Sequence, residues 1–278
     1  MRTRAPWLRR FGVAAIAVWS LFPLYWALNV SLQTQAQASS RPAHYLPPTP
    51  TLDNYRALLV GDGDLAQTVR QTMLNIFIEC SASTVITVAI ATFAAYAFAR
   101  MKFRGSKVMF YVVLGTMAFP PYTTLIPLYR ILTEAGLVNT YTGIVLVYVS
   151  GFLPLATWVL HNYISALPVA LEEAGRVDGA TRMQILRQII LPLARPGIVS
   201  TAIITFLFGW AQFLFPLVLS SDISTQPLTV AIAGMQGRHL VPYTLLNAAG
   251  VVALAIPAAV ALFTNRYIVS GLLTGSVK

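Results

Sequence analysis

The chain has 278 residues, of which 56% are hydrophobic and 10% are charged, and its mean hydropathy is +0.68. A soluble domain carries about 25% charged residues, so this composition excludes a water-soluble globule and indicates a protein of the lipid bilayer. A net charge of +10 would favour a nucleic-acid partner in a soluble protein. Membrane orientation explains the basic residues better, and we expect no nucleic-acid partner.

Six apolar stretches are long enough, or nearly so, for the roughly 20 residues that a spanning helix needs. They are expected at 11–32, 71–99, 108–132, 141–166, 197–220 and 243–264. In the third stretch, Pro120, Pro121 and Pro127 remove backbone donors and predict a kink or a break. The sequence therefore predicts an all-α, polytopic membrane protein with about six transmembrane helices in a single domain over residues 1–278.

The basic residues are distributed unevenly over the connecting segments. If the N-terminus is cytoplasmic, the segments expected inside (1–10, 100–107, 167–196 and 265–278) hold 14 of the 19 Lys and Arg residues. Cytoplasmic loops carry such an excess, so both termini are predicted to be cytoplasmic. A cleaved signal peptide ending at Ala36-Gln37-Ala38 is the competing interpretation. The apolar run before it, however, exceeds the 7–15 residues of a signal-peptide core.

Residues 33–70 form a polar segment that this topology places outside. The stretch from Pro47 to Tyr55 predicts an extended arm followed by a helical turn that Asp53 could cap. A plain loop between two spans is the alternative, and the sequence alone favours it.

The connection at 167–196 has the pattern of two short helices. Pro168 could begin the first, whose first turn carries Glu172 and Glu173. Asp178 and Gly179 then turn the chain. Such a segment either docks a soluble partner or rests on lipid headgroups.

The second of these helices has its own start and stop signals. Thr181 and Gln184 have the spacing of a capping box. Pro192 and Pro196 are expected to end the helix, because proline cannot continue the hydrogen-bond ladder.

Several kinds of chemistry have no residues to support them. The single cysteine, Cys80, cannot form an intrachain disulfide, and His44, His161 and His239 lie in separate segments without ligand spacing, so no metal site is expected. None of the three lysines follows a glycine, so a phosphate-binding P-loop is absent from the sequence. We expect any ATP to bind to another chain.

The 167–196 segment resembles a known family motif. Glu173-Ala174-Gly175, Gly179 and Ile189-x-Leu191-Pro192 match the EAA loop of bacterial ABC importer permeases at every spacing, with Gly175 in place of the second Ala. Other segments resemble the carbohydrate branch of these permeases, although Ile76 and Ala211 depart from its pattern. These segments are 50–55, 74–75, 209–213 and the tail 266–278. Together they resemble the second permease of a heterodimeric maltose-type importer.

The resemblance implies a fold, partners and a coupling site. The expected fold is that of a type I ABC importer permease in the bacterial inner membrane, and the chain itself is expected to be no enzyme. The implied partners are a second permease, two ATPase subunits that bind ATP and Mg, and an external binding protein that delivers sugar to the loops at 33–70 and 221–242. The segment 167–196 would be the cytoplasmic coupling loop, with these contact residues: Glu173, Ala174, Gly175, Gly179, Ile189, Leu191 and Pro192.

A sugar pathway would need hydroxyls, amides and aromatic rings rather than charge pairs. The candidates are Asn75, Tyr122, Tyr148, Trp210 and Gln212. Glu79 is a further candidate, because a carboxylate within a span costs roughly 2.5–3.5 kcal/mol and therefore faces protein, water or a headgroup. A pathway or inter-subunit role with Asn75 or Gln212 as its partner is one interpretation. Solvation near the outer interface is the other and is slightly favoured.

Two alternative functions remain open at this point. A permease for glycerol-phosphate esters would need basic residues along its pathway, and the predicted spans contain no Lys or Arg except Arg130, two residues before the end of the third. A secondary transporter would use intramembrane ionisable residues and often internal repeats, of which the chain shows one acid and no repeat.

Overall fold

The computed structural model describes residues 6–101, 103–236 and 241–273. All the secondary-structure elements in these residues are helices, connected by turns and loops with no strand among them, which confirms the all-α prediction. The chain forms two compact units, one of residues 1–73 with 228–256 and one of residues 74–227 with 257–278. The single domain predicted for 1–278 stays a prediction.

The first unit contains α1 (Pro6–Ser31), α2 (Gln35–Ala38), α3 (Asp53–Leu59) and α12 (Leu228–Gln236). It also contains the first ten residues of α4 (Asp64–Arg100) and the part of α13 (Tyr243–Leu273) that precedes Pro257. None of the apolar window of α1 is buried within the chain, and Trp19 and Phe11 are among its exposed side chains. An apolar helix with no protein around it suits lipid or another membrane chain.

The segment after α1 is held by specific hydrogen bonds and is more than a plain loop. The amide of Asn54 donates to the carbonyls of Ser31 and Gln33 at 2.8 and 2.9 Å, and the hydroxyls of Tyr55 and Ser31 lie 2.6 Å apart. The helical turn forms as predicted, but Asp53 is its first residue and not its cap. The N-cap position belongs to Leu52, which has no side-chain acceptor to offer.

The second unit is built around three long helices, α4 from Leu74 onward, α7 (Tyr141–Ala166) and α10 (Leu191–Trp210). The shorter elements around them are α5 (Ser106–Gly115), η1 (Thr116–Ala118), α6 (Pro121–Glu134), α8 (Ala170–Val177), α9 (Arg182–Ile185), η2 (Leu186–Ile190) and α11 (Leu214–Leu219). Small residues allow the long helices to approach closely. A Cβ on Gly209 of α10 would lie 3.2 Å from the Cys80 sulfur of α4, and one on Gly197 would lie 2.5 Å from the Tyr163 ring of α7.

Five described helices are long and apolar enough to span a membrane, or six if a bent pair counts as one span. The predicted stretches 11–32, 71–99, 141–166 and 243–264 correspond to α1, α4, α7 and α13. The third stretch is the bent pair, in which Ser106–Ala118 and Pro121–Glu134 meet at 98°. The break falls at Pro120 and Pro121 as predicted, whereas Pro127 lies inside α6 without ending it.

The fifth span differs from its prediction at both ends. Pro192 and Pro196 do not stop the helix, and Arg182–Trp210 is one helical span. The five residues before Leu191 form a π-helical turn. This wider turn lies where the Pro192 ring would otherwise meet the carbonyl four residues earlier. The span then ends at Trp210 rather than near 220, and α11 follows as a separate helix.

Candidate functional site

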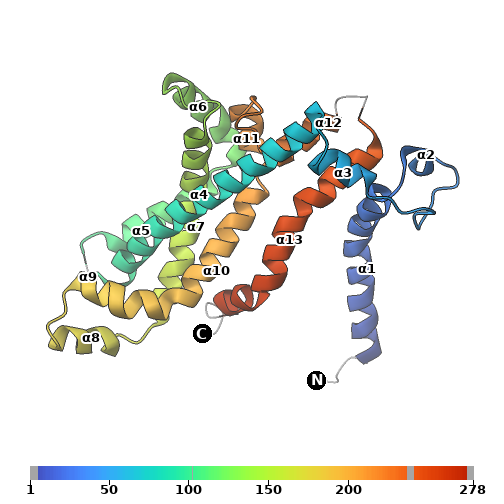
Figure 1. The fold of residues 1–278 in the computed structure, drawn as a ribbon. Coiled ribbons are helices and arrows are strands. Elements are labelled where there is room, and N and C mark those ends of the chain that lie inside the picture. Colours follow the sequence, from blue (N-terminus) through green and yellow to red (C-terminus); the bar gives the residue numbers. More distant parts are fainter. Residues whose placement is uncertain (1–5, 102, 237–240, 274–278) are drawn as a thin grey trace. The chain divides into compact units, whose positions relative to one another are not determined.

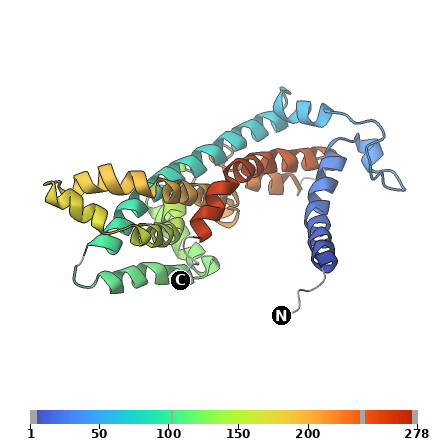
Figure 2. The ribbon, with the colours of Figure 1, turned by 90° about the horizontal axis from the view of Figure 1, so that it is seen from below.

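The two-helix segment formed by α8, α9 and η2 lies at one end of the second unit. Figures 1 and 2 both show α8 and α9 beyond the ends of α7 and α10, and Figure 1 shows α6 and α11 at the opposite end of α7. The first helix begins at Ala170 and not at Pro168 as expected. Gly179 makes the turn between the helices with φ +81°, a left-handed conformation that glycine adopts without steric cost.

The second helix begins as the sequence predicts. Thr181 and Gln184 form a capping box, in which the Thr181 amide donates to the Gln184 side chain at 2.7 Å. Because α9, η2 and α10 are continuous, this cap fixes the first turn of a helix that extends into the spanning region.

An apolar cluster packs this segment against the long helices. Ile185, Leu186 and Ile190 are buried against Leu160 and Ile164 of α7. The same cluster includes Ala91 and Ala95 of α4. Burial of these side chains holds the segment to two long helices at once.

A buried ion pair provides a second attachment. Nε of Arg100, the last residue of α4, lies 2.7 Å from Oε1 of Glu172 on α8, and their side chains are only 8% and 2% exposed. The Arg100 guanidinium also donates to the carbonyls of Ile164 and Leu167, at 2.8 and 2.6 Å. One side chain therefore joins the ends of α4 and α7 to α8.

The residues that match the family motif divide between an outer and an inner face. Glu173, Ala174, Gly179 and Pro192 are exposed, Ile189 and Leu191 are half-buried, and Gly175 is buried. Among the described residues, no basic side chain lies within 4 Å of the Glu173 carboxylate. Glu173 thus presents a carboxylate to solvent, while its neighbour Glu172 is held inside.

Gly175 occupies the position where the family pattern has alanine. A Cβ there would lie 2.9 Å from Cδ1 of Ile189, the flexible end of a side chain. We expect Gly175→Ala to leave the stability of the protein within about 1 kcal/mol, because the gain in helix propensity offsets a small shift of Ile189. Thermal unfolding of the purified variant measures this, and a loss of several kcal/mol would show that Ile189 cannot move.

A buried polar stripe runs along α4. Asn75, Glu79, Ser83 and Thr87 follow one another at intervals of four residues, and all are fully buried. The Asn75 amide donates to the carbonyls of Ile223 and Gln226, both at 2.8 Å, and its oxygen accepts from the Tyr141 hydroxyl at 2.6 Å. These contacts fix the chain after α11 to α4 and α7.

The burial of Glu79 contradicts the slightly favoured interpretation that its carboxylate is solvated near the outer interface. Its side chain is 0% exposed, and neither carboxylate oxygen has a hydrogen-bond partner among the described residues. In the other interpretation Asn75 or Gln212 is the partner of Glu79, but neither donates a hydrogen bond to this carboxylate. The Tyr148 hydroxyl on α7 is also buried without a hydrogen-bond partner there, and it lies within electrostatic reach of Glu79.

The other pathway candidates lie on or beside α6 and α10. Tyr122 is 76% exposed at the start of α6, and Gln212 is half-buried between α10 and α11. Trp210 is buried against Phe206, with ring centroids 5.6 Å apart. Their pathway role stays a prediction, as does that of Asn75, Glu79 and Tyr148.

Metal-ligating side chains do not cluster in the part of the chain that the structure describes, where no group of three or more His, Cys, Asp or Glu could hold an ion. His44 belongs to the first unit and His161 to the second. His239 lies outside the described residues.

Comparison with known proteins shows the family to which this chain belongs. The model of the family described as "Binding-protein-dependent transport system inner membrane component" matches residues 87–273, which include both helices of the segment, all of α7 and α10, and α4 from residue 87 onward. The chain belongs to this family.

Curated relatives align with this permease over almost its entire length. The trehalose/maltose transport system permease protein MalG of Thermococcus litoralis is 35% identical over 96% of this chain and 95% of its own. The sulfoquinovosyl glycerol transport system permease protein SmoH of Agrobacterium fabrum is 31% identical over 98% and 93%. The trehalose transport system permease protein SugB of Mycobacterium tuberculosis is 34% identical over 94% and 93%.

The fold of the permease also matches a solved structure. A chain of a bacterial ABC transporter involved in the import of alginate superposes with a TM-score of 0.79, at 21% identity, over 96% of this permease and 99% of that chain. The predicted importer permease fold and the multi-pass inner-membrane location are confirmed. The secondary-transporter alternative is set aside by family membership. The last five residues of the tail motif, 274–278, lie outside the described residues.

Proposed function

We propose that this permease is one of two membrane-spanning subunits of an ATP-driven sugar importer, and that α8, α9 and η2 form the surface on which an ATPase subunit docks. The observation that carries this proposal is the exposed Glu173 on a segment that is fixed from behind to the ends of α4 and α7. Relatives that transport trehalose, maltose and α-glucosides by name support the sugar class.

The outer face of the segment has the composition of a protein contact. Val169, Leu171, Val177 and Met183, which lie on or beside α8 and α9, are exposed apolar side chains. Apolar area together with a free carboxylate suits a cleft on a soluble partner with a basic residue at its edge. ATP and Mg would bind to that partner and not to this chain.

The construction of the segment suggests how a movement of the ATPase reaches the membrane. Because α9 and η2 continue into α10, a displacement of the segment by the ATPase would move α9, η2 and α10 together as one helix. The Arg100–Glu172 pair carries the same displacement to the ends of α4 and α7. Packed helices move as rigid bodies, so the spans would shift together between inward- and outward-open states.

The absence of basic residues from α7 and most of α4 favours a neutral sugar as the transported substrate. Between Arg70 and Arg100, α4 has no Lys or Arg, and neither does α7. A glycerol-phosphate ester would call for such residues along its path. An external binding protein would deliver the sugar to the side opposite α8, with both termini of the permease in the cytoplasm.

The docking proposal predicts a selective effect of charge reversal. In an importer assembled from the co-expressed permeases and ATPase, Glu173→Lys should reduce co-purification of the ATPase at least tenfold, because a lysine would meet the basic edge of the cleft. The matched control is Glu134→Lys on exposed α6, at the other end of α7, which should leave assembly unchanged. Equal recovery of ATPase with both variants would refute the docking surface.

The sugar class is tested separately by the reconstituted complex. ATPase activity should rise when the binding protein is loaded with a neutral glycoside and should not rise with a glycerol-phosphate ester. Stimulation by the ester alone would replace the sugar proposal without affecting the docking proposal.

A further inference from the structure

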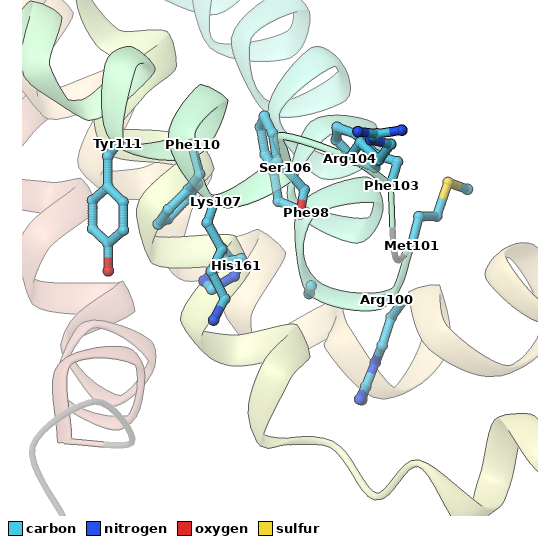
Figure 3. A pocket seen from close by; sticks show the side chains of 11 residues that line it. Phe98, Arg100, Met101, Phe103, Arg104, Ser106, Lys107, Phe110, Tyr111 and His161 are labelled. Carbon is cyan, nitrogen blue, oxygen red and sulfur yellow. The ribbon is translucent and has the colours of Figure 1, made fainter.

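A pocket of about 630 Å³ lies where the end of α4, the start of α5 and the last third of α7 meet, within the second unit (Figure 3). Its lining includes four aromatic rings, those of Phe98, Phe103, Phe110 and Tyr111. No acidic residue is among the lining residues, and neither the docking proposal nor the sugar pathway uses this pocket.

Two cations of the pocket have no counter-charge. Arg104 and Lys107 line it, and neither forms an ion pair with any acidic residue that the structure describes. Arg100 also lines the pocket, but its guanidinium is occupied by Glu172, and Figure 3 shows it pointing away from the other labelled side chains. Figure 3 shows these two side chains extending on opposite sides of the labelled group, so the pocket has an unpaired, exposed cation at each side, and both attract an anion.

The aromatic rings form a continuous apolar wall beside these cations. The ring centroid of Phe98 lies 5.5 Å from that of Phe110 and 6.1 Å from that of Phe103. The ring of His161 packs on Phe110 at 4.3 Å, and its Nδ1 atom is buried without a hydrogen-bond partner among the described residues. The ligand therefore needs both an anionic and an apolar part.

The position of the pocket along the helices sets its depth in the membrane. Arg100 ends the spanning helix α4, and the next apolar helix begins at Ser106. Residues at such span ends lie where the hydrocarbon meets the lipid headgroups. Basic pockets between transmembrane helices at this level bind anionic headgroups.

We propose that this pocket binds the phosphate headgroup of an anionic phospholipid. Arg104 and Lys107 attract the anionic headgroup from the two sides of the pocket, and the aromatic wall packs on the glycerol and the first acyl carbons. Bound there, the lipid would lie beside the Arg100 end of α4.

The test measures binding of short-chain lipids to the full-length permease purified in a neutral detergent. Dioctanoyl phosphatidylglycerol, dioctanoyl phosphatidylcholine and inorganic phosphate are titrated separately and followed by calorimetry. Wild type should bind the phosphatidylglycerol at least tenfold more tightly than the phosphatidylcholine. Removing both cations with Arg104→Gln/Lys107→Gln should weaken phosphatidylglycerol binding roughly 30-fold. This fold-change corresponds to about 2 kcal/mol, because each tenfold step in affinity is about 1.4 kcal/mol.

A control variant separates the pocket from general charge. Arg9→Gln/Arg10→Gln removes two exposed cations from α1 and should leave phosphatidylglycerol binding unchanged. Equal binding of the two lipids by wild type, or equal losses in the two double variants, overturns the proposal. Binding of inorganic phosphate as tight as that of phosphatidylglycerol would assign the pocket to a soluble phosphate and overturn the lipid assignment.

Discussion

Glu172→Ala is expected to lower the free energy of unfolding by about 3–5 kcal/mol, because it leaves the guanidinium of Arg100 buried without its counter-charge. Arg100 still donates to the carbonyls of Ile164 and Leu167, so it cannot turn out to solvent without losing both bonds. Arg176 does not replace it as a partner for the carboxylate, since its nearest approach to Glu172 is 3.9 Å and its side chain is mostly exposed. Chemical or thermal unfolding of the purified permease measures the loss.

The adjacent residue provides the control for this prediction. Glu173→Ala removes the same group from an exposed position and should change stability by no more than about 0.5 kcal/mol. A double-mutant cycle with Arg100→Leu should show a coupling of about 0.5–3 kcal/mol between Arg100 and Glu172. If the two alanine variants unfold alike, or if the cycle is additive, the ion pair does not hold α8 to α4.

Gly179→Pro has the largest expected effect on transport. Gly179 has φ +81°, whereas the proline ring fixes φ near −65°, so the turn between α8 and α9 cannot form. The substitution also removes the amide that donates to the carbonyl of Arg176. We expect uptake to fall at least a hundredfold in the assembled importer, while the protein still inserts into the membrane. Radiolabelled sugar uptake and quantification of the membrane fraction measure the two effects.

Two further variants distinguish the turn from a general loss of stability. Gly179→Asn should retain a substantial part of the uptake, because asparagine tolerates the left-handed region better than other side chains. Gly136→Pro disrupts a turn of the same handedness between α6 and α7, away from the docking surface, and should leave co-purification of the ATPase intact. Normal uptake by Gly179→Pro would show that the segment does not couple the ATPase to the spans.

The spans and the motif could be predicted because their signals are local. Apolar length alone located α1, α4, α7 and α13, since each must cross the same thickness of hydrocarbon. The break at Pro120 and Pro121 follows from the missing amides of two adjacent prolines. The capping box at Thr181 and Gln184 and the turn at Gly179 likewise depend on residues within a few positions of one another.

The inner and outer faces of α8 could not be predicted in this way. By hydropathy, Leu171 and Val177 should be buried and Glu172 exposed, and the structure shows the reverse. The reason is the position of Arg100, at the end of a helix distant in sequence, where it can neutralise a carboxylate only if α8 turns Glu172 inward. The motif match singles out Glu173, but neither hydropathy nor position in the first turn predicts that Glu172 is the buried carboxylate.

The sequence by itself thus determined the helical class, the apolar spans and the family of this permease, because these depend on composition and on short spacings. Tertiary structure alone decided that Pro192 lies within a continuous helix, that Glu79 is fully buried and that Glu172 pairs with Arg100. Each of these depends on which groups meet across separate helices. A proline or a carboxylate is tolerated or excluded by those neighbours, and a local pattern carries no information about them.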